Sequence, residues 1–186
     1  MLNNSSFFRT LNSSAMKSGL YAGILWIIGL VCFCRSFDSA FCNNVFVIIV
    51  ILSPFLIGYL AHRFQREYLP GSQRVYSKLY FYSLMTYVYG GIILAVAVFV
   101  YFLYWDKGIF FDSYLNFLNR PDIKSLLDAS FKGSGNGMSV EMLKDSVVQM
   151  SQMKVSVYAL TVFYMNMVCG IFVSIPIALV CNIIKK

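Results

Sequence analysis

Side chains that could carry out chemistry are few in this chain of 186 residues. His62 is the only histidine, and Arg63 and Arg66 follow it closely. A histidine can act as a general base, but no serine, cysteine or carboxylate stands with it in a recognisable nucleophilic arrangement. The neighbouring arginines instead favour a histidine that lies beside phosphate groups. No catalytic residue is assigned, and a non-enzymatic role is favoured.

Carboxylates and thiols give no stronger indication of a reactive site. The aspartates between positions 106 and 128 could pair for acid–base catalysis, but they alternate with lysines and Arg120, as a solvated surface does. The five cysteines and His62 lack the spacing of metal ligands, so we expect no metal and no cofactor. The sequence does not decide whether Cys34 and Cys42 form a disulfide. The basic residues do not belong to any nucleic-acid-binding motif, so no nucleic-acid partner is expected.

The composition identifies the class of protein. Hydrophobic residues make up 59% of the chain and charged residues only 12%. Soluble domains are about 45–50% apolar even with glycine counted, and about 25% charged. So few charges could not cover the surface of a soluble protein of this size. The chain is therefore predicted to be an integral membrane protein.

Four apolar stretches are long enough to cross a bilayer as helices. Continuous runs such as "VFVIIVIL" favour helices over the alternating strands of a barrel. We predict an all-α integral membrane protein, a single domain over residues 1–186, with a polar, frayed tail up to residue 15. The transmembrane helices are expected at about 18–35, 45–62, 79–105 and 158–183, with a small extracytoplasmic helical segment over 106–157.

Orientation follows from the basic residues in the short connections. One side carries eight bases against one acid, Glu67; the bases are Arg9, Lys17, Arg63, Arg66, Arg74, Lys78, Lys185 and Lys186. The other side has seven bases and seven acids, so the net charge of +7 lies on one side. This asymmetry predicts cytoplasmic termini in a multi-pass protein of the bacterial inner membrane. The residues expected to bind anionic lipid headgroups there are His62, Arg63, Arg66, Arg74 and Lys78.

Small residues recur at helical spacing and predict close helix packing. The residues concerned are Gly19 and Gly23, Gly91 and Ala95, and Gly170, Ser174 and Ala178. Packing within one bundle is favoured over an interface with a second copy. The same pattern is also compatible with a homo-oligomer. Pro54 and Pro176 are predicted to kink the second and fourth helices.

The external segment is predicted to contain two or three short amphipathic helices. Pro121 fits the first turn of one helix, and Ser139 is a suitable N-cap for another. The glycine-rich stretch 133–137 lies between them and is expected to be a linker.

The order of these parts resembles a known family. The stretches that carry the resemblance are "SAMKSGLYAGILW", "LIGYLAHRFQRE", "YGGIILAVAVFVYFLYWDKGIF" and "CGIFVSIPIALV". The chain resembles a family of small four-helix inner-membrane proteins from Bacteroidetes, catalogued as a domain of unknown function. The resemblance implies no catalytic residues. It does imply a role beside a membrane glycosyltransferase of the polyprenyl-phosphate type.

Two functions follow as hypotheses. The first is a non-enzymatic accessory or scaffold subunit for a membrane enzyme or assembly, with a basic cytoplasmic interface for anionic lipid. The alternative is a small carrier or flippase for an amphipathic lipid or a polyprenyl-phosphate-linked substrate. The alternative predicts a groove across the membrane lined by Ser53, Thr86, Asn166 and Ser174.

Overall fold

The chain folds into helices throughout the part that the structure, a computed structural model, describes: residues 4–69, 75–134 and 139–184. The elements are α1 (Asn4–Cys34), α2 (Ala40–Tyr68), α3 (Val75–Val100), the π-helical turn η1 (Tyr101–Asp106), α4 (Ile109–Leu118), α5 (Pro121–Ser134), α6 (Val140–Ser151) and α7 (Val155–Ile184). Four stretches are long and apolar enough to cross a membrane: Phe7–Cys34, Ala40–Tyr68, Val75–Asp106 and Val155–Ile184. The predicted all-α, four-span membrane protein is confirmed.

The first helix begins earlier than the sequence predicted. Residues up to 15 were expected to fray, but α1 starts at Asn4. The reason is an apolar stripe at helical spacing, formed by Phe7, Leu11 and Ala15, which is buried in the core. The Lys78 ammonium group also lies 4.6 Å from the centre of the Phe7 ring. Tertiary packing therefore holds this polar segment in the helix.

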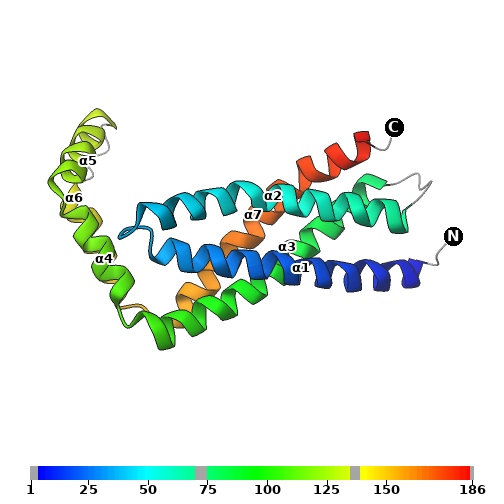
Figure 1. The fold of residues 1–186 in the computed structure, drawn as a ribbon, viewed down its shortest axis with the longest axis horizontal. Coiled ribbons are helices and arrows are strands. Elements are labelled where there is room, and N and C mark those ends of the chain that lie inside the picture. The colour runs from blue at the N-terminus through cyan, green and yellow to red at the C-terminus, as the bar shows by residue number, and fades with distance from the viewer. Residues whose placement is uncertain (1–3, 70–74, 135–138, 185–186) are drawn as a thin grey trace.

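The four long helices form a bundle with two different ends (Figure 1). The start of α1, the end of α2, the start of α3 and the end of α7 lie at one end, here called the terminal end. Helices α4, α5 and α6 lie across the other end and form the cap. Within the bundle, α3 packs along α1 and α7, whereas α2 pairs with α1 and meets α7 over a shorter stretch.

Glycines allow α3 to approach both of its neighbours closely. A Cβ atom added at Gly19 of α1 would lie 2.5 Å from the Tyr89 Cβ and 3.0 Å from the Gly90 nitrogen of α3. One added at Gly170 of α7 would lie 2.7 Å from the Tyr87 Cβ. Neither position has room for a larger residue, so glycine sets the distance between these helix axes.

The terminal half of the bundle is tightly packed. The rings of Phe64 and Tyr82 stack with centroids 4.2 Å apart, and the Tyr82 hydroxyl lies 2.6 Å from the Ser18 hydroxyl. Ile57 and Leu79 are fully buried beside them. These contacts join α1, α2 and α3 into one core.

A π-helical turn and a left-handed corner end the third span. Lys107 and Gly108 follow η1 with φ angles of 44° and 91°, a conformation for which glycine is suited. Asp106 is only 3% exposed, and its carboxylate accepts hydrogen bonds from the Gly108 and Phe110 backbone N–H groups at 3.2 and 3.1 Å. The buried carboxylate thus holds the start of α4. Asp106 does not belong to the solvated face expected from the sequence.

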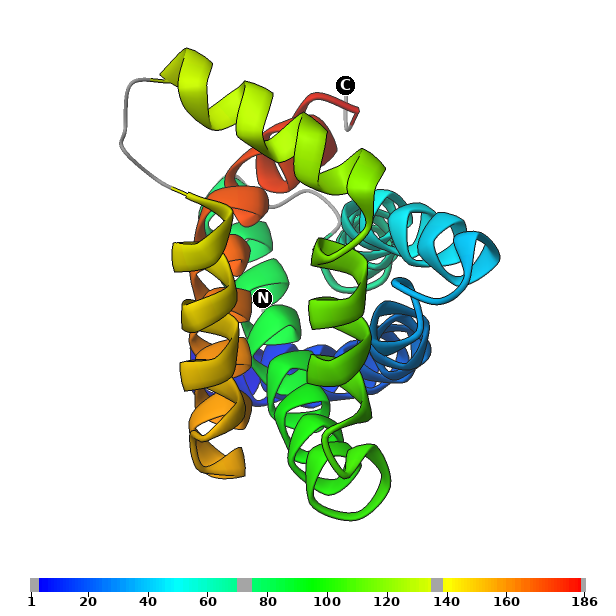
Figure 2. The same ribbon diagram turned by 90° about the vertical axis from the view of Figure 1, so that its left-hand side faces the viewer.

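The cap contains three short helices in the described residues, as predicted. Leu118 of α4 and Val140 and Val147 of α6 are buried. The Ser139 hydroxyl accepts a hydrogen bond from the Met142 N–H at 3.2 Å, and α5 begins at Pro121, so both predicted helix starts are confirmed. Viewed from this end, α4 and α6 run side by side, and α5 lies across their upper ends (Figure 2). The predicted linker 133–137 lies mostly outside the described residues.

Replacement of Gly19 by alanine tests the close approach of α1 and α3. We expect Gly19→Ala to lower the free energy of unfolding by about 1–3 kcal/mol, since the new methyl group meets backbone atoms that cannot move away. Thermal denaturation in mild detergent measures the change. Gly58→Ala is the matched control, because its Cβ would come no closer than 4.0 Å to Ile177. Equal melting temperatures for both variants would contradict the packing described here.

Candidate functional site

A cavity of about 630 Å³ lies inside the cap half of the bundle. Its walls come from α1, α2, α3, η1 and α7, and residues of α4 and α6 also contribute. The volume is within the range of roughly 300–1,000 Å³ that is usual for small-molecule sites. Leu30, Ile49, Leu94 and Val98 are typical of the side chains that line it. The cavity is therefore a candidate site for a small apolar ligand.

Aromatic rings close the cavity toward the cap. The six aromatic residues at this end of the lining are Phe33, Phe46, Phe102, Phe110, Phe111 and Tyr158. Phe33 lies 5.1 Å from Phe46 and 5.5 Å from Phe110 between ring centroids, and Phe102 lies 5.3 Å from Tyr158. These contacts join α1, α2, η1, α4 and α7. These six aromatic residues, here called the roof, close the cavity at its cap end. They also form the contact between the bundle and the cap.

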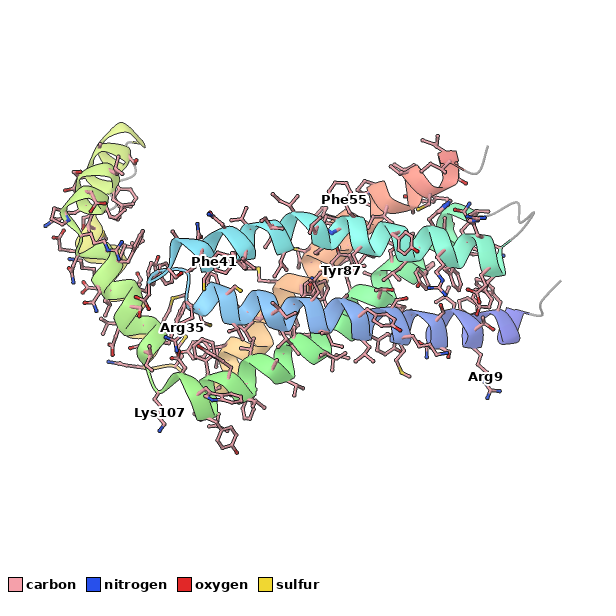
Figure 3. The ribbon with its side chains drawn as sticks, viewed as in Figure 1. Arg9, Arg35, Phe41, Phe55, Tyr87 and Lys107 are labelled. Atoms are coloured by element: carbon pink, nitrogen blue, oxygen red, sulfur yellow. The ribbon has the colours of Figure 1, made fainter. Side chains whose placement is uncertain are left out.

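Another aromatic pair forms the floor of the cavity near the middle of the bundle. The rings of Trp26 and Tyr87 stack with centroids 5.5 Å apart, and both residues are buried. Figure 3 shows Tyr87 between the helices, whereas Phe55 of α2 points outward. Beyond this floor the terminal half is packed: the Cys181 thiol of α7 lies 3.6 Å from the Gly58 carbonyl of α2, as expected for a sulfur hydrogen bond. The cavity therefore does not continue across the described bundle.

Few polar groups reach the cavity, and some of them are already bonded. The residues of the lining that carry hydroxyl, amide or thiol groups are Ser53, Tyr87, Tyr158, Thr161, Asn166 and Cys169. The Asn166 side-chain N–H donates to the Tyr87 carbonyl at 2.9 Å, and the Tyr158 hydroxyl donates to the Met150 carbonyl. Thr86 and Ser174 do not line the cavity and are fully buried. Of the four residues predicted for a groove, the structure brings Ser53 and Asn166 to one site.

The cavity opens to one side of the bundle, between α2 and α7. The lining residues Trp26 of α1 and Val98 of α3 are 8% and 1% exposed. By contrast, Val50 of α2 is 53% exposed and Val157 of α7 is 42% exposed, and Thr161 is exposed as well. Three other exposed lining residues, Phe33, Met150 and Met153, lie at the cap end. Along the long helices below the cap, the exposed lining residues belong to α2 and α7, so the mouth lies between these two helices.

The cavity offers no group of residues that is typical of catalysis. His62 lies outside it, and no cluster of three or more histidines, cysteines or acids that could hold a metal occurs among the described residues. Cys34 and Cys42 are both free thiols in the structure. What the arrangement can do is enclose an apolar group beside a few hydroxyl and amide groups.

The basic residues predicted for lipid headgroups lie at the terminal end. Arg63 and Arg66 are exposed, and His62 and Lys78 are half-buried. All four belong to the last turns of α2 or the first turn of α3, which meet at this end (Figure 1). Arg74 lies outside the described residues. Arg9 and Lys17 of α1 add to the same end, so these six bases form what we call the basic collar: Arg9, Lys17, His62, Arg63, Arg66 and Lys78.

The small residues predicted for helix packing lie between helices of one bundle. Gly19 and Gly23 face α3, where an added Cβ would meet Tyr89 and Ile93, and Gly91 faces α7. Gly170, Ser174 and Ala178 are buried on α7, and Ala95 is half-buried. Because Gly91 meets Asn166 and Gly170 meets Tyr87, the antiparallel register brings Ser83 opposite Ser174.

Both prolines lie within continuous helices. Pro54 is inside α2 and Pro176 is inside α7. Pro54 follows the cavity residue Ser53, and Pro176 lies beyond the floor, where it is exposed.

The sequence did not single out the roof or Asp106. No spacing in the sequence relates the six aromatic residues of the roof, and only their common position in space reveals the cluster. The available signal was the density of phenylalanine and tyrosine at both ends of the third span. Asp106 was treated as a surface acid, although its position directly after "YFLYW" placed it at the end of a long apolar segment.

Comparison with known proteins identifies the family. The family model described as "Protein of unknown function (DUF4199)" matches residues 17–182 of the 186. The chain therefore belongs to this family, and the resemblance to a domain of unknown function is confirmed. The comparisons with curated proteins and with solved structures found no significant match.

Removal of the Asp106 carboxylate tests how the cap is held. In Asp106→Ala the Gly108 and Phe110 N–H groups lose their acceptor, so we expect a loss of about 1–2 kcal/mol, concentrated at the η1–α4 corner. Limited proteolysis should cut residues 107–120 faster than in the wild type. Asp145→Ala, which removes an exposed carboxylate from α6, should leave cleavage unchanged. Equal cleavage in both variants would show that Asp106 does not anchor the cap.

Proposed function

We propose that this member of the DUF4199 family is a non-enzymatic accessory protein of a bacterial inner membrane, and that its basic collar binds anionic lipid headgroups on the cytoplasmic side. The observation that carries the proposal is the placement of the collar: six bases from α1, α2 and α3 gather at the terminal end. Cytoplasmic leaflets are rich in anionic lipids, and basic residues in short connections favour this side. The termini would then be cytoplasmic and the cap extracytoplasmic.

The collar suits phosphate in chemistry as well as in position. Arg63 and Arg66 are exposed beside the half-buried His62, so their guanidinium groups are free to form paired hydrogen bonds with phosphate oxygens. Lys78 keeps its stem against the Phe7 ring. Glu67 is the only acid in this part of the sequence. A surface of this kind supports binding of lipid headgroups.

An accessory role is supported by the surface that the fold leaves exposed. The glycine faces are already used within the bundle, so a partner has to dock elsewhere. The cap offers exposed apolar side chains on α5 and α6, among them Leu126 at 64% and Met142 at 58%. Charged residues surround them, as at a transient protein interface. The partner we propose is a membrane enzyme, and a polyprenyl-phosphate glycosyltransferase is the first one to test.

The cavity favours a second candidate, a small carrier for an amphipathic lipid. Its mouth between α2 and α7 is where a lipid could enter. A carrier would also have to open the terminal half, where Gly58 and Cys181 hold α2 against α7. Because that step requires a second arrangement of the bundle, the accessory role is the better-supported function.

Loss of two collar arginines should reduce lipid binding. In Arg63→Ala/Arg66→Ala we expect the retention of anionic phospholipid to fall roughly 30-fold, since each base near a membrane surface contributes about 1 kcal/mol. Native mass spectrometry of protein released from mild detergent measures the bound lipid. The control is Lys144→Ala/Lys154→Ala, which removes the same charge from the cap end. If both variants lose lipid equally, the collar is not the headgroup site.

An added charge on the cap should release the partner enzyme. A tagged chain purified from native membranes is expected to retain a membrane enzyme in fixed proportion, and Leu126→Asp should abolish this retention because it places a charge in the apolar contact. Gln149→Asp adds the same charge at an exposed polar position of α6 and should retain the partner. A chain that purifies alone or only as a homodimer would contradict the accessory role.

A further inference from the structure

The cavity in the cap half has no role in the proposed binding of headgroups by the collar. It lies beyond the Trp26–Tyr87 floor, whereas the collar lies at the terminal end. Its size, its lining and the direction of its mouth together define what can fill it. We propose that this cavity binds one hydrocarbon chain of a membrane lipid, acyl or isoprenoid, which enters between α2 and α7.

Water is unsuited to the cavity. A buried water molecule needs two to four polar partners, and apolar cavities of this kind remain dry. The wall is built mainly from residues such as Leu30, Leu94 and Val98, and the Asn166 side-chain N–H is already bonded to the Tyr87 carbonyl. A dry cavity of about 630 Å³ with nothing in it would leave its walls without contacts on one side. An apolar ligand restores these contacts.

The surroundings of the mouth supply such a ligand. Next to the lining residue Val50, the outward residues Val47 and Ile51 of α2 are 44% and 56% exposed. On α7, Leu160 and Val168 are 54% and 49% exposed. All of these residues lie within the membrane-spanning stretches, so the mouth opens onto lipid tails. A chain can therefore enter sideways without crossing a polar layer.

The roof and the floor define how the chain lies. The aromatic roof, which includes Phe102 and Phe110, closes the cavity toward the cap, and the stacked rings of Trp26 and Tyr87 stop it in the middle of the bundle. The chain thus occupies the cap half alone, and its polar head stays outside the mouth. The lining contains few free polar groups, so recognition depends on apolar contact and shape. These features favour a linear chain over a polar substrate.

Tryptophan fluorescence can test this proposal directly. The chain has two tryptophans, Trp26 on the cavity floor and Trp105, which is 72% exposed at the end of the third span. In a Trp105→Phe background, Trp26 is the only reporter. The probe is a vesicle of phospholipid with brominated acyl chains, because bromine quenches a tryptophan that it contacts. Since Trp26 is only 8% exposed, strong quenching requires a chain inside the cavity.

Two variants at the mouth and two controls make the test specific. In the same background, Val50→Phe and Thr161→Phe place a ring at the mouth, one from α2 and one from α7. Their direct neighbours Ile51→Phe and Leu160→Phe add the same ring on the lipid-facing side. An unchanged Trp26 emission spectrum in unbrominated lipid shows that each variant is folded.

We expect Trp26 to lose most of its fluorescence in brominated lipid. In the mouth variants Val50→Phe and Thr161→Phe the fluorescence should be largely retained, whereas in the controls Ile51→Phe and Leu160→Phe it should be quenched as in the parent. Added polyprenol that restores the fluorescence beyond simple dilution would identify an isoprenoid as the preferred chain. Recovery that matches dilution would identify an acyl chain. Unquenched Trp26, or equal quenching in the mouth variants and in their controls, would overturn the proposal. Neither result depends on the collar, so the headgroup proposal is tested separately.

Discussion

Close packing around α3 is the constraint on which the rest of this structure depends. In a bilayer no hydrophobic force drives one apolar helix toward another, so helices associate where small residues allow many van der Waals contacts. Two adjacent glycines of α3 provide this on two sides: Gly90 lies against Gly19 and Trp26 of α1, and Gly91 lies against Asn166 of α7. Helices α1 and α7 are thereby held to two different faces of the same helix. Only α2 is left to be placed by other contacts.

The cavity is a consequence of how α2 is placed. This helix pairs with α1 and reaches α7 at Gly58, which leaves the cap half of α2 and α7 apart. Large aromatic side chains fill the upper part of that space, and the buried Asp106 carboxylate holds α4 over it. The buried carboxyl group is tolerated at this depth because it accepts two backbone hydrogen bonds. The cap therefore depends on a polar contact at the end of an apolar span.

The two ends of the bundle differ in what they can bind. The terminal end carries exposed arginines that suit phosphate, and the cap half carries an apolar chamber that opens sideways. These two features are the basis of the proposals that the protein binds lipid headgroups at one end and a lipid chain in the other half.

The sequence by itself determined the class of the protein and the number of its spans. Long apolar runs with so few charges can be accommodated only by helices in a membrane, because each backbone group must be bonded within its own segment. The helix starts at Pro121 and Ser139 were also predictable, since a helix start depends on neighbouring residues alone.

What the sequence could not determine depends on contacts between distant segments. Phe7 and Leu11 extend α1 to Asn4 because the core of α2 and α3 lies beside them, so a segment that was expected to fray is helical. Val50 and Thr161 share a mouth, and Phe33, Phe102 and Phe110 share a roof, although no spacing in the chain relates them. Composition shows whether a helix lies in a membrane or in water. Only the tertiary structure determines where two helices separate enough to leave a site between them.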